Sequence, residues 1–112
     1  MKSTVIVITR KGMGHAPDDL AQTLIKNYLN LLSEEKKLPF ALLLYGEGVK
    51  LTGMDSPVLD SLKKLEADGV KIIACKTCLN YYGIADQIAV GQIGSMSDIL
   101  TIQMEASKVV TI

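Results

Sequence analysis

Three short apolar runs, each ending near a glycine-rich turn or a helical signal, constrain the fold of this chain more than any other feature. The runs cover residues 4–9, 40–45 and 70–74, and they are apolar at nearly every position rather than at alternate ones. Continuously apolar strands are typical of parallel sheets, which are buried on both faces by their connecting helices. The sequence therefore predicts an α/β fold built on a mostly parallel sheet.

The segment after the first run predicts a helix with one buried stripe. Pro17 suits the first helical turn by its fixed φ, and Asp18 and Asp19 suit it by their charge against the helix dipole. Apolar residues then recur at helical spacing up to about residue 33, so we expect them to face the sheet. These residues are Leu20, Leu24, Ile25, Tyr28, Leu31 and Leu32.

The remaining elements continue the alternation of strands and helices. Ser95 and Asp98, three residues apart, resemble a capping box at the start of a helix. With right-handed connections, about five strands in this order predict a flavodoxin-like three-layer sandwich formed by one domain over residues 1–112. The other expected elements are helices near 57–69, 76–82 and 95–104, a loop or short strand at 91–94 and an edge strand at 108–112.

The composition excludes several classes of protein. The 112 residues are 48% hydrophobic with a net charge of zero, so a core can form without disulfides or a structural metal. Scattered, charge-balanced lysines argue against nucleic-acid binding, and no apolar run approaches the roughly 20 residues of a membrane helix. The N-terminus has no signal-peptide pattern. We therefore expect a cytoplasmic protein without membrane segments, in which a C-x-x-C pair is chemically active rather than a structural bridge.

Both cysteines, Cys75 and Cys78, lie where the third strand is expected to lead into a helix. A thiol attacks as the thiolate, and backbone N–H groups at a helix start favour that anion. In a flavodoxin-like sheet, ligands bind outside the carboxyl ends of strands one and three. We therefore expect the thiols to face the loop that follows strand one across a crevice. The residues of this loop are Gly12, Met13, Gly14 and His15.

Each candidate residue also has an ordinary structural interpretation. Cys75 is either a nucleophile or a small buried hydrophobe, and its position at the strand end favours the nucleophile. For Cys78, a resolving or disulfide-forming role and a packing role are equally favoured. His15, the only histidine, could transfer protons, but an exposed loop residue is the favoured interpretation. The Gly46-x-Gly48 and Gly12-x-Gly14 patterns match no phosphate-binding motif, so tight turns explain them equally well.

Two other site types agree poorly with the pattern around the cysteines. A thioredoxin-like motif would carry an aromatic residue before the first cysteine and a proline between the two, and the chain has neither. Zinc would find only Cys75, Cys78 and His15 in one chain, whereas a closed structural site needs four ligands. We expect neither a metal nor a cofactor.

Three sequence blocks resemble the DsrE/TusD-like family of sulfur-relay proteins. They are Gly12-Met13-Gly14 with the following Asp18-Asp19-Leu20, residues 45–52, and residues 75–83, in which Cys75 precedes Gly83 by eight positions. Residues 91–96 form a weaker fourth block. The residues of these blocks are most similar to the DsrE-like domain of YedF-type proteins, which are associated with sulfur transfer and selenium metabolism.

The resemblance implies a DsrE-like fold and a persulfide on Cys75 that is passed between proteins, with Cys78 modulating the thiol. It also implies a homo-oligomer, a trimer or a hexamer. Because the chain lacks the Cys-Pro motif of a TusA-like domain, we expect the partner cysteine to come from another polypeptide. The alternative is a non-catalytic subunit that binds partners through its oligomer. Expected pocket residues, besides the loop after strand one, are Gly46, Gly48, Val49, Asn80 and Tyr81.

Overall fold

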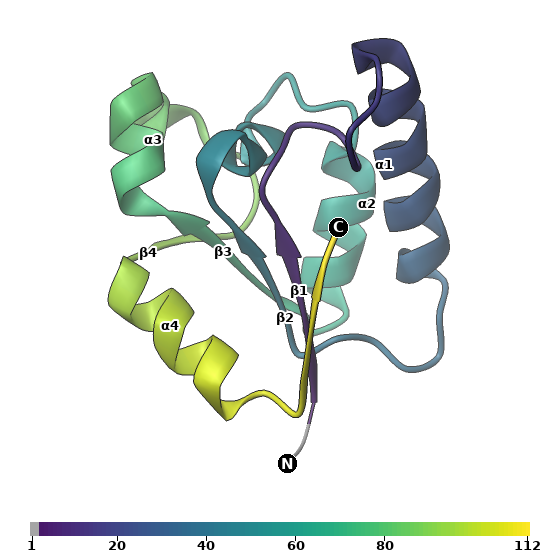
Figure 1. The fold of residues 1–112 in the computed structure, drawn as a ribbon, viewed down its shortest axis with the longest axis vertical. Coiled ribbons are helices and arrows are strands. Elements are labelled where there is room, and N and C mark those ends of the chain that lie inside the picture. Colours follow the sequence, from purple (N-terminus) through teal and green to yellow (C-terminus); the bar gives the residue numbers. More distant parts are fainter. Residues whose placement is uncertain (1–2) are drawn as a thin grey trace.

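A computed structural model describes residues 3–112 and contains a five-stranded parallel sheet between layers of helices (Figure 1). The first three strands are buried at almost every position, as their continuous apolar sequences predict. The α/β class and the parallel sheet are thus confirmed. The strands are β1 (Thr4–Ile8), β2 (Ala41–Leu44), β3 (Lys71–Cys75), β4 (Gln92–Gly94) and β5 (Lys108–Thr111).

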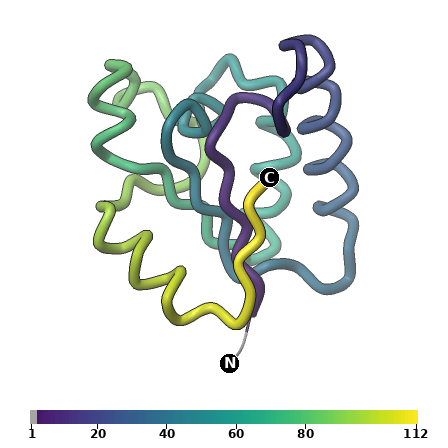
Figure 2. Tube along the Cα trace, viewed as in Figure 1, coloured from purple at the N-terminus to yellow at the C-terminus, as the bar shows by residue number. Residues whose placement is uncertain are grey.

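The helices form the outer layers of the sandwich. Figures 1 and 2 show α1 and α2 side by side on one face of the sheet, α4 on the other face, and α3 beyond the carboxyl end of β3. No helix within residues 3–112 combines the length and apolar character needed to cross a membrane. The helices are α1 (Asp18–Ser33), η1 (Gly46–Thr52), α2 (Leu59–Ala67), α3 (Lys76–Tyr82), η2 (Ala85–Gln87) and α4 (Met96–Glu105), of which η1 and η2 are 3₁₀ helices.

The strand order differs from the flavodoxin-like order that the sequence suggested. The order is β4-β3-β2-β1-β5, so β2 separates β1 from β3, whereas a flavodoxin-like sheet places strands one and three side by side. The burial of the strands agrees with this order: Ala41–Leu44 is fully buried and occupies the centre, while β5 is largely exposed and forms an edge. The expected crevice between strands one and three therefore does not exist.

Helix α1 buries a narrower stripe than the sequence predicted. Its buried apolar residues are Ala21, Ile25 and Leu29, one row at a spacing of four. Leu20, Leu24 and Leu31 were expected in the core but are 49%, 39% and 63% exposed. Each turn holds 3.6 residues, so a residue next to the buried row points about 100° away from it. This leaves part of the apolar surface of α1 facing outward.

The ends of the helices largely follow their sequence signals. At the start of α4, Ser95 and Asp98 form the predicted capping box, with each side chain accepting the other residue's N–H. Helix α3 ends at Gly83, which adopts a left-handed φ of +68°. Helix α2 begins at Leu59, two residues later than Pro57, because the Ser56 hydroxyl accepts the Val58 N–H in a preceding turn.

Candidate functional site

The two cysteines lie at the junction of β3 and α3 and differ in their burial. Cys75 is the last residue of β3 and the N-cap of α3; it is 0% exposed and belongs to the hydrophobic core. Cys78 lies three residues further on, in the first turn of α3, and is partly exposed. Both thiols are free. The junction thus carries one buried thiol and one that reagents can approach.

The 3₁₀ helix η1 provides the polar contact of the site. The Gly46 N–H donates a hydrogen bond to Cys78 Sγ at 3.1 Å. Glycine is required here, because Gly46 has a φ of +59° and a Cβ on Gly48 would lie 2.2 Å from the carbonyl oxygen of Ile8. The two glycines therefore allow η1 to pack between the end of β1 and α3, where the short coil is visible in Figure 1.

The electrostatic environment of Cys78 differs from the expected one. Burial raises the pKa of the Cys78 thiol, the Gly46 hydrogen bond opposes this, and Cys75 raises the pKa further through a hydrogen bond and like charge. The sequence predicted a lowered pKa at this junction. That expectation is wrong for Cys78, because partial burial disfavours the thiolate more than one backbone N–H stabilises it.

A second group of side chains, from η1 and α3, lies one helical turn from Cys78. Lys50 Nζ is 4.4 Å from the centre of the Tyr82 ring and 4.0 Å from the Glu47 carboxylate. Burial raises the pKa of Tyr82, followed by the charges of Glu47, Tyr81 and Cys78. The sequence alone indicates Tyr82, beside Tyr81, as a candidate for the pocket or an oligomer interface, whereas its contact with Lys50 comes only from the structure. A cavity of about 370 Å³ is lined by Lys50, Gly53, Met54, Asp55, Tyr82, Ile84 and Gln87.

The loop after β1 packs against α1 instead of facing the thiols. The Met13 N–H donates to the Ala21 carbonyl at 3.0 Å, and a Cβ on Gly12 would lie 2.6 Å from the Ala21 Cβ. His15 is exposed and lies 2.8 Å from the Arg10 guanidinium, while Gly14 is an exposed left-handed glycine. The expectation that this loop faces the cysteines is therefore wrong, since β2 and η1 lie between the end of β1 and β3.

The other expected pocket residues have different surroundings. Gly46 contacts Cys78 directly, and Gly48 holds η1 against β1. Val49 is fully buried in the core, so it lines no open pocket. Asn80 is exposed, and Tyr81 is 83% exposed with its ring edge-on to Tyr82 at 5.2 Å between centroids. Among residues 3–112, no group of three or more His, Cys, Asp or Glu side chains comes together as metal ligands would.

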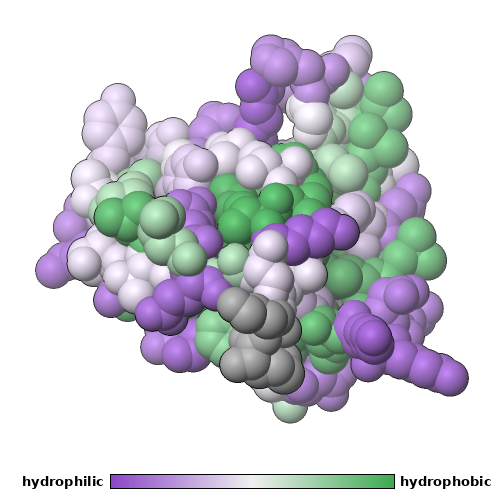
Figure 3. Space-filling model, turned by 60° about the horizontal axis from the view of Figure 1, so that its bottom comes forward, coloured by the Kyte–Doolittle hydropathy of each residue, from purple (hydrophilic) through white to green (hydrophobic). Residues whose placement is uncertain are grey.

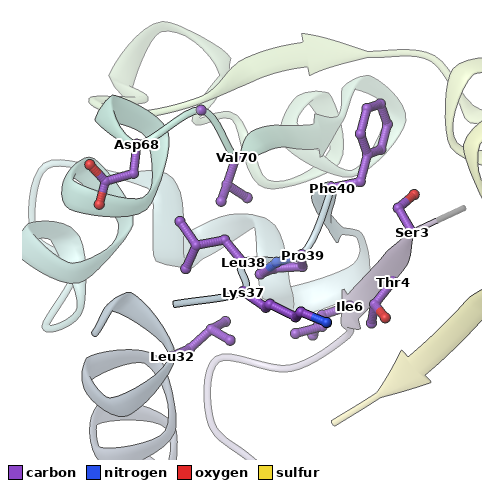
Figure 4. Close-up of a pocket in the computed structure, with 11 residues that line it drawn as sticks. Ser3, Thr4, Ile6, Leu32, Lys37, Leu38, Pro39, Phe40, Asp68 and Val70 are labelled. Atoms are coloured by element: carbon purple, nitrogen blue, oxygen red, sulfur yellow. The ribbon is translucent and has the colours of Figure 1, made fainter. Parts of the chain in front are cut away.

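A larger cavity lies at the other end of the sheet, and neither cysteine lines it. It has a volume of about 670 Å³ and lies at the amino ends of β1 and β2 (Figure 4). Ile6, Leu38 and Val70 line it, with Lys37 and Asp68 as its charged residues. In Figure 3, which brings the amino-end face forward, apolar side chains gather at the middle of that face among hydrophilic ones. Neither cysteine lines this cavity, so we assign the functional site to the thiols.

Comparisons with known proteins identify similar folds over the whole chain. A sequence model of the DsrE/DsrF-like family matches residues 2–112. The YchN protein of E. coli is 25% identical with a TM-score of 0.72, and each chain is covered fully by the other. MTH1491 of Methanobacterium thermoautotrophicum, a protein of unknown function, is 21% identical with a TM-score of 0.73 over 100% of both chains.

A third structure is more distant. The conserved protein BT1422 of Bacteroides thetaiotaomicron, also of unknown function, is 19% identical with a TM-score of 0.64, over 98% of this chain and 95% of its own. No curated protein matches the chain. The resemblance to DsrE-like proteins that the sequence blocks carried is thereby confirmed.

Proposed function

Because this chain belongs to the DsrE/DsrF-like family, whose members generally act in sulfur relay, we propose that it carries sulfane sulfur as a persulfide on Cys75 and passes it to a partner protein. The observation that carries the proposal is the pair of free thiols at the carboxyl end of β3, one partly exposed and held by the Gly46 N–H. Thiolate attack on a sulfane sulfur needs positioned sulfur atoms more than an elaborate acid–base apparatus.

The direct test is intact-mass measurement after incubation with a cysteine desulfurase and cysteine. Wild type should gain one sulfur atom that survives brief washing with glutathione, because a persulfide on the buried Cys75 is shielded from the bulky thiol. Cys75→Ser should retain no sulfur after the wash, and dithiothreitol should remove it from wild type. Wild type that gains no sulfur while Cys78 can still be alkylated would contradict the proposed function.

The partner and the assembly belong to the same proposal. The donor or acceptor is another protein with a reactive cysteine, such as a TusA-like protein, in the reducing cytoplasm, where both thiols stay free. The cargo is sulfur or selenium. A homo-oligomer, a trimer or a hexamer, is supported by large apolar side chains on the surface, since monomers rarely leave such rows open. On α4, Met96, Leu100 and Met104 are all exposed at a spacing of four residues.

A second candidate function has its own supporting observation. Because Cys75 has no exposed surface, the chain could act as a non-catalytic subunit whose oligomer binds partners. Under this candidate, Cys75→Ser leaves every partner-dependent activity unchanged. Under the sulfur-carrier proposal, Cys75→Ser abolishes sulfur transfer to the partner while the oligomer stays intact, as gel filtration would show.

A further inference from the structure

The positions of the two thiols present a problem for direct loading of Cys75. Transfer of sulfur between proteins needs the donor sulfur to approach within bonding distance, about 2.05 Å in the S–S bond that forms. Cys75 is 0% exposed, so the thiol of another protein does not reach it in this conformation. Cys78 is partly exposed and is the only other cysteine of the chain.

The helix geometry places the two cysteines at neighbouring positions on the first turn of α3. Cys75 is the N-cap of α3 and Cys78 is three residues later, the same two positions that Ser95 and Asp98 occupy at the start of α4. In α4 these side chains fold over the first turn and bond to the backbone of each other. In α3 the Cys75 side chain makes no such cap bond, and residues three apart on a helix are neighbours, with their Cβ atoms about 5–6 Å apart. Sulfur on Cys78 therefore lies within reach of Cys75.

We propose that the two cysteines form an internal relay, in which Cys78 accepts sulfane sulfur at the surface and Cys75 stores it in the core. The relay rests on the proposed function, because it assigns the entry and storage steps of that sulfur carrier. It makes Cys78 a catalytic residue with its own step, and it uses the burial of Cys75 as protection of the persulfide from solution thiols.

The transfer balances without an oxidant or a reductant. A donor persulfide, R–S–SH, gives its outer sulfur to the Cys78 thiolate, forming Cys78–S–SH and releasing the donor thiolate. The Cys75 thiolate then attacks the outer sulfur of Cys78–S–SH. The new bond joins Cys75 Sγ to that sulfur, which keeps its proton, and the old S–S bond breaks. Cys78 leaves as a thiolate, so the negative charge passes from Cys75 to Cys78. The reverse sequence delivers sulfur to an acceptor.

The Gly46 N–H favours this outcome over disulfide formation. Attack on the inner sulfur would instead form a Cys75–Cys78 disulfide and expel hydrosulfide. A hydrogen bond from Gly46 at 3.1 Å stabilises negative charge on Cys78 Sγ, so it assists the departure of Cys78 when the outer sulfur is attacked. In this role Gly46 is a positioning residue that acts through the leaving thiolate.

Peptide mapping can follow the sulfur because a lysine separates the two cysteines. Trypsin cleaves after Lys71, Lys76 and Lys108, which puts Cys75 on the peptide 72–76 and Cys78 on 77–108. The folded protein is mixed with inorganic polysulfide, quenched at successive times with an alkylating reagent under denaturing conditions, digested and analysed by mass spectrometry. Sulfur should be found first on 77–108 and later on 72–76.

Three variants and a control sharpen the test. Cys78→Ser should slow loading of Cys75 at least about tenfold, because the intramolecular route is lost. Cys75→Ala should load at Cys78 and lose that sulfur quickly to glutathione. Thr77→Ala, which changes an exposed residue between the cysteines, should load as wild type does. Cys78→Ala and thermal melting of each variant verify that slow loading does not come from misfolding.

The relay would be overturned by sulfur on Cys75 before Cys78, by wild-type loading of Cys75 in Cys78→Ser, or by a disulfide with hydrosulfide as the main product. Polysulfide that leaves no sulfur on Cys75 of wild type would also overturn it. The proposed function is tested separately by the desulfurase. If polysulfide loads the thiols in the predicted order and the desulfurase loads none, the relay stands and transfer from this protein donor fails.

Discussion

At the scale of single residues, Cys78 is the side chain on which opposing effects meet. Burial and the nearby Cys75 thiol raise the pKa of Cys78, and the Gly46 N–H lowers it. Because burial is the largest of these causes, the resting thiol is mostly protonated near neutral pH. A protonated resting thiol is protected from oxidation, and the hydrogen bond that its sulfur accepts from the Gly46 N–H becomes stronger when charge forms on the sulfur.

This balance predicts the pH dependence of alkylation. The rate at Cys78 should follow its thiolate fraction, with a midpoint above the ordinary range of a thiol. In Cys75→Ala the midpoint should fall, because the hydrogen bond and the like charge of Cys75 are removed, but burial should keep it raised. Iodoacetamide rates between pH 7 and 11, measured on peptide 77–108, check this. A midpoint that stays the same in Cys75→Ala would contradict the coupling of the thiols.

The same shift has a consequence for stability. The native state binds the Cys78 proton more tightly than the unfolded chain, so this contribution is fully present below the ordinary thiol pKa. It is lost as the pH rises through the raised pKa. Urea unfolding of wild type and Cys78→Ala over this alkaline range should therefore show a steeper loss of unfolding free energy in wild type.

Gly48 has a purely steric role at the site. A Cβ there would lie 2.2 Å from the Ile8 carbonyl oxygen and 2.9 Å from its carbon, so η1 would have to move away from β1. Gly48→Ala should lower the unfolding free energy by roughly 1–3 kcal/mol. Gly53→Ala is the matched control, since the nearest atom would be 3.5 Å away and its φ is −78°. Urea denaturation of both variants measures the difference; equal stabilities would contradict the steric argument.

At the scale of elements, the helix starts show how local sequence signals act in the structure. The capping box of Ser95 and Asp98 fixes the first turn of α4, while η1 has no comparable signal and follows from its packing against β1 and α3. A 3₁₀ helix has three residues per turn and is short, so it leaves no apolar stripe at the 3.6-residue spacing of an α-helix. Elements with local signals can therefore be predicted, and η1 could not.

The capping box supplies a stability prediction. Ser95→Ala removes the acceptor for the Asp98 N–H and should lower the unfolding free energy by about 1 kcal/mol. Ser97→Ala, on the same helix turn but outside the box, should change it by less than about 0.5 kcal/mol. Thermal unfolding of the two variants is the comparison; a larger effect at Ser97 would show that the cap does not hold the helix start.

At the scale of the whole molecule, the sheet topology decides which loops meet. Since β2 lies between β1 and β3, the segment after β2 contacts Cys78, and the loop after β1 packs on α1. The topology also leaves α4 on its own face with Met96, Leu100 and Met104 outward. These outward rows are the surface on which the proposed oligomer can be tested.

Substitution on α4 tests that assembly. Light scattering on wild type should give a mass of several 12.1 kDa chains. Leu100→Asp should lower it toward one chain, because a charge in an apolar interface loses its hydration without a partner. Leu31→Asp, at an exposed apolar position on α1, is the control that should leave the mass unchanged. A monomeric wild type would contradict the proposed oligomer, and loss of mass only in Leu31→Asp would assign the interface to α1.

The sequence by itself determined the α/β class, the parallel sheet, the limits of α1 and α4, and the place of both cysteines at the end of β3. These features depend on local spacing: apolar runs, helical periodicity and caps act within a few residues. It also carried the family resemblance, because the blocks lie in a fixed order along the chain.

The tertiary structure decided the strand order, the hydrogen bond from Gly46 to Cys78, and the difference in burial between Cys75 and Cys78. It also decided which row of α1 faces the core. These features depend on contacts between residues far apart in the chain, such as the 32 positions between Gly46 and Cys78. Local patterns cannot rank such contacts, because many strand orders bury the same apolar residues and only packing of the whole chain selects one.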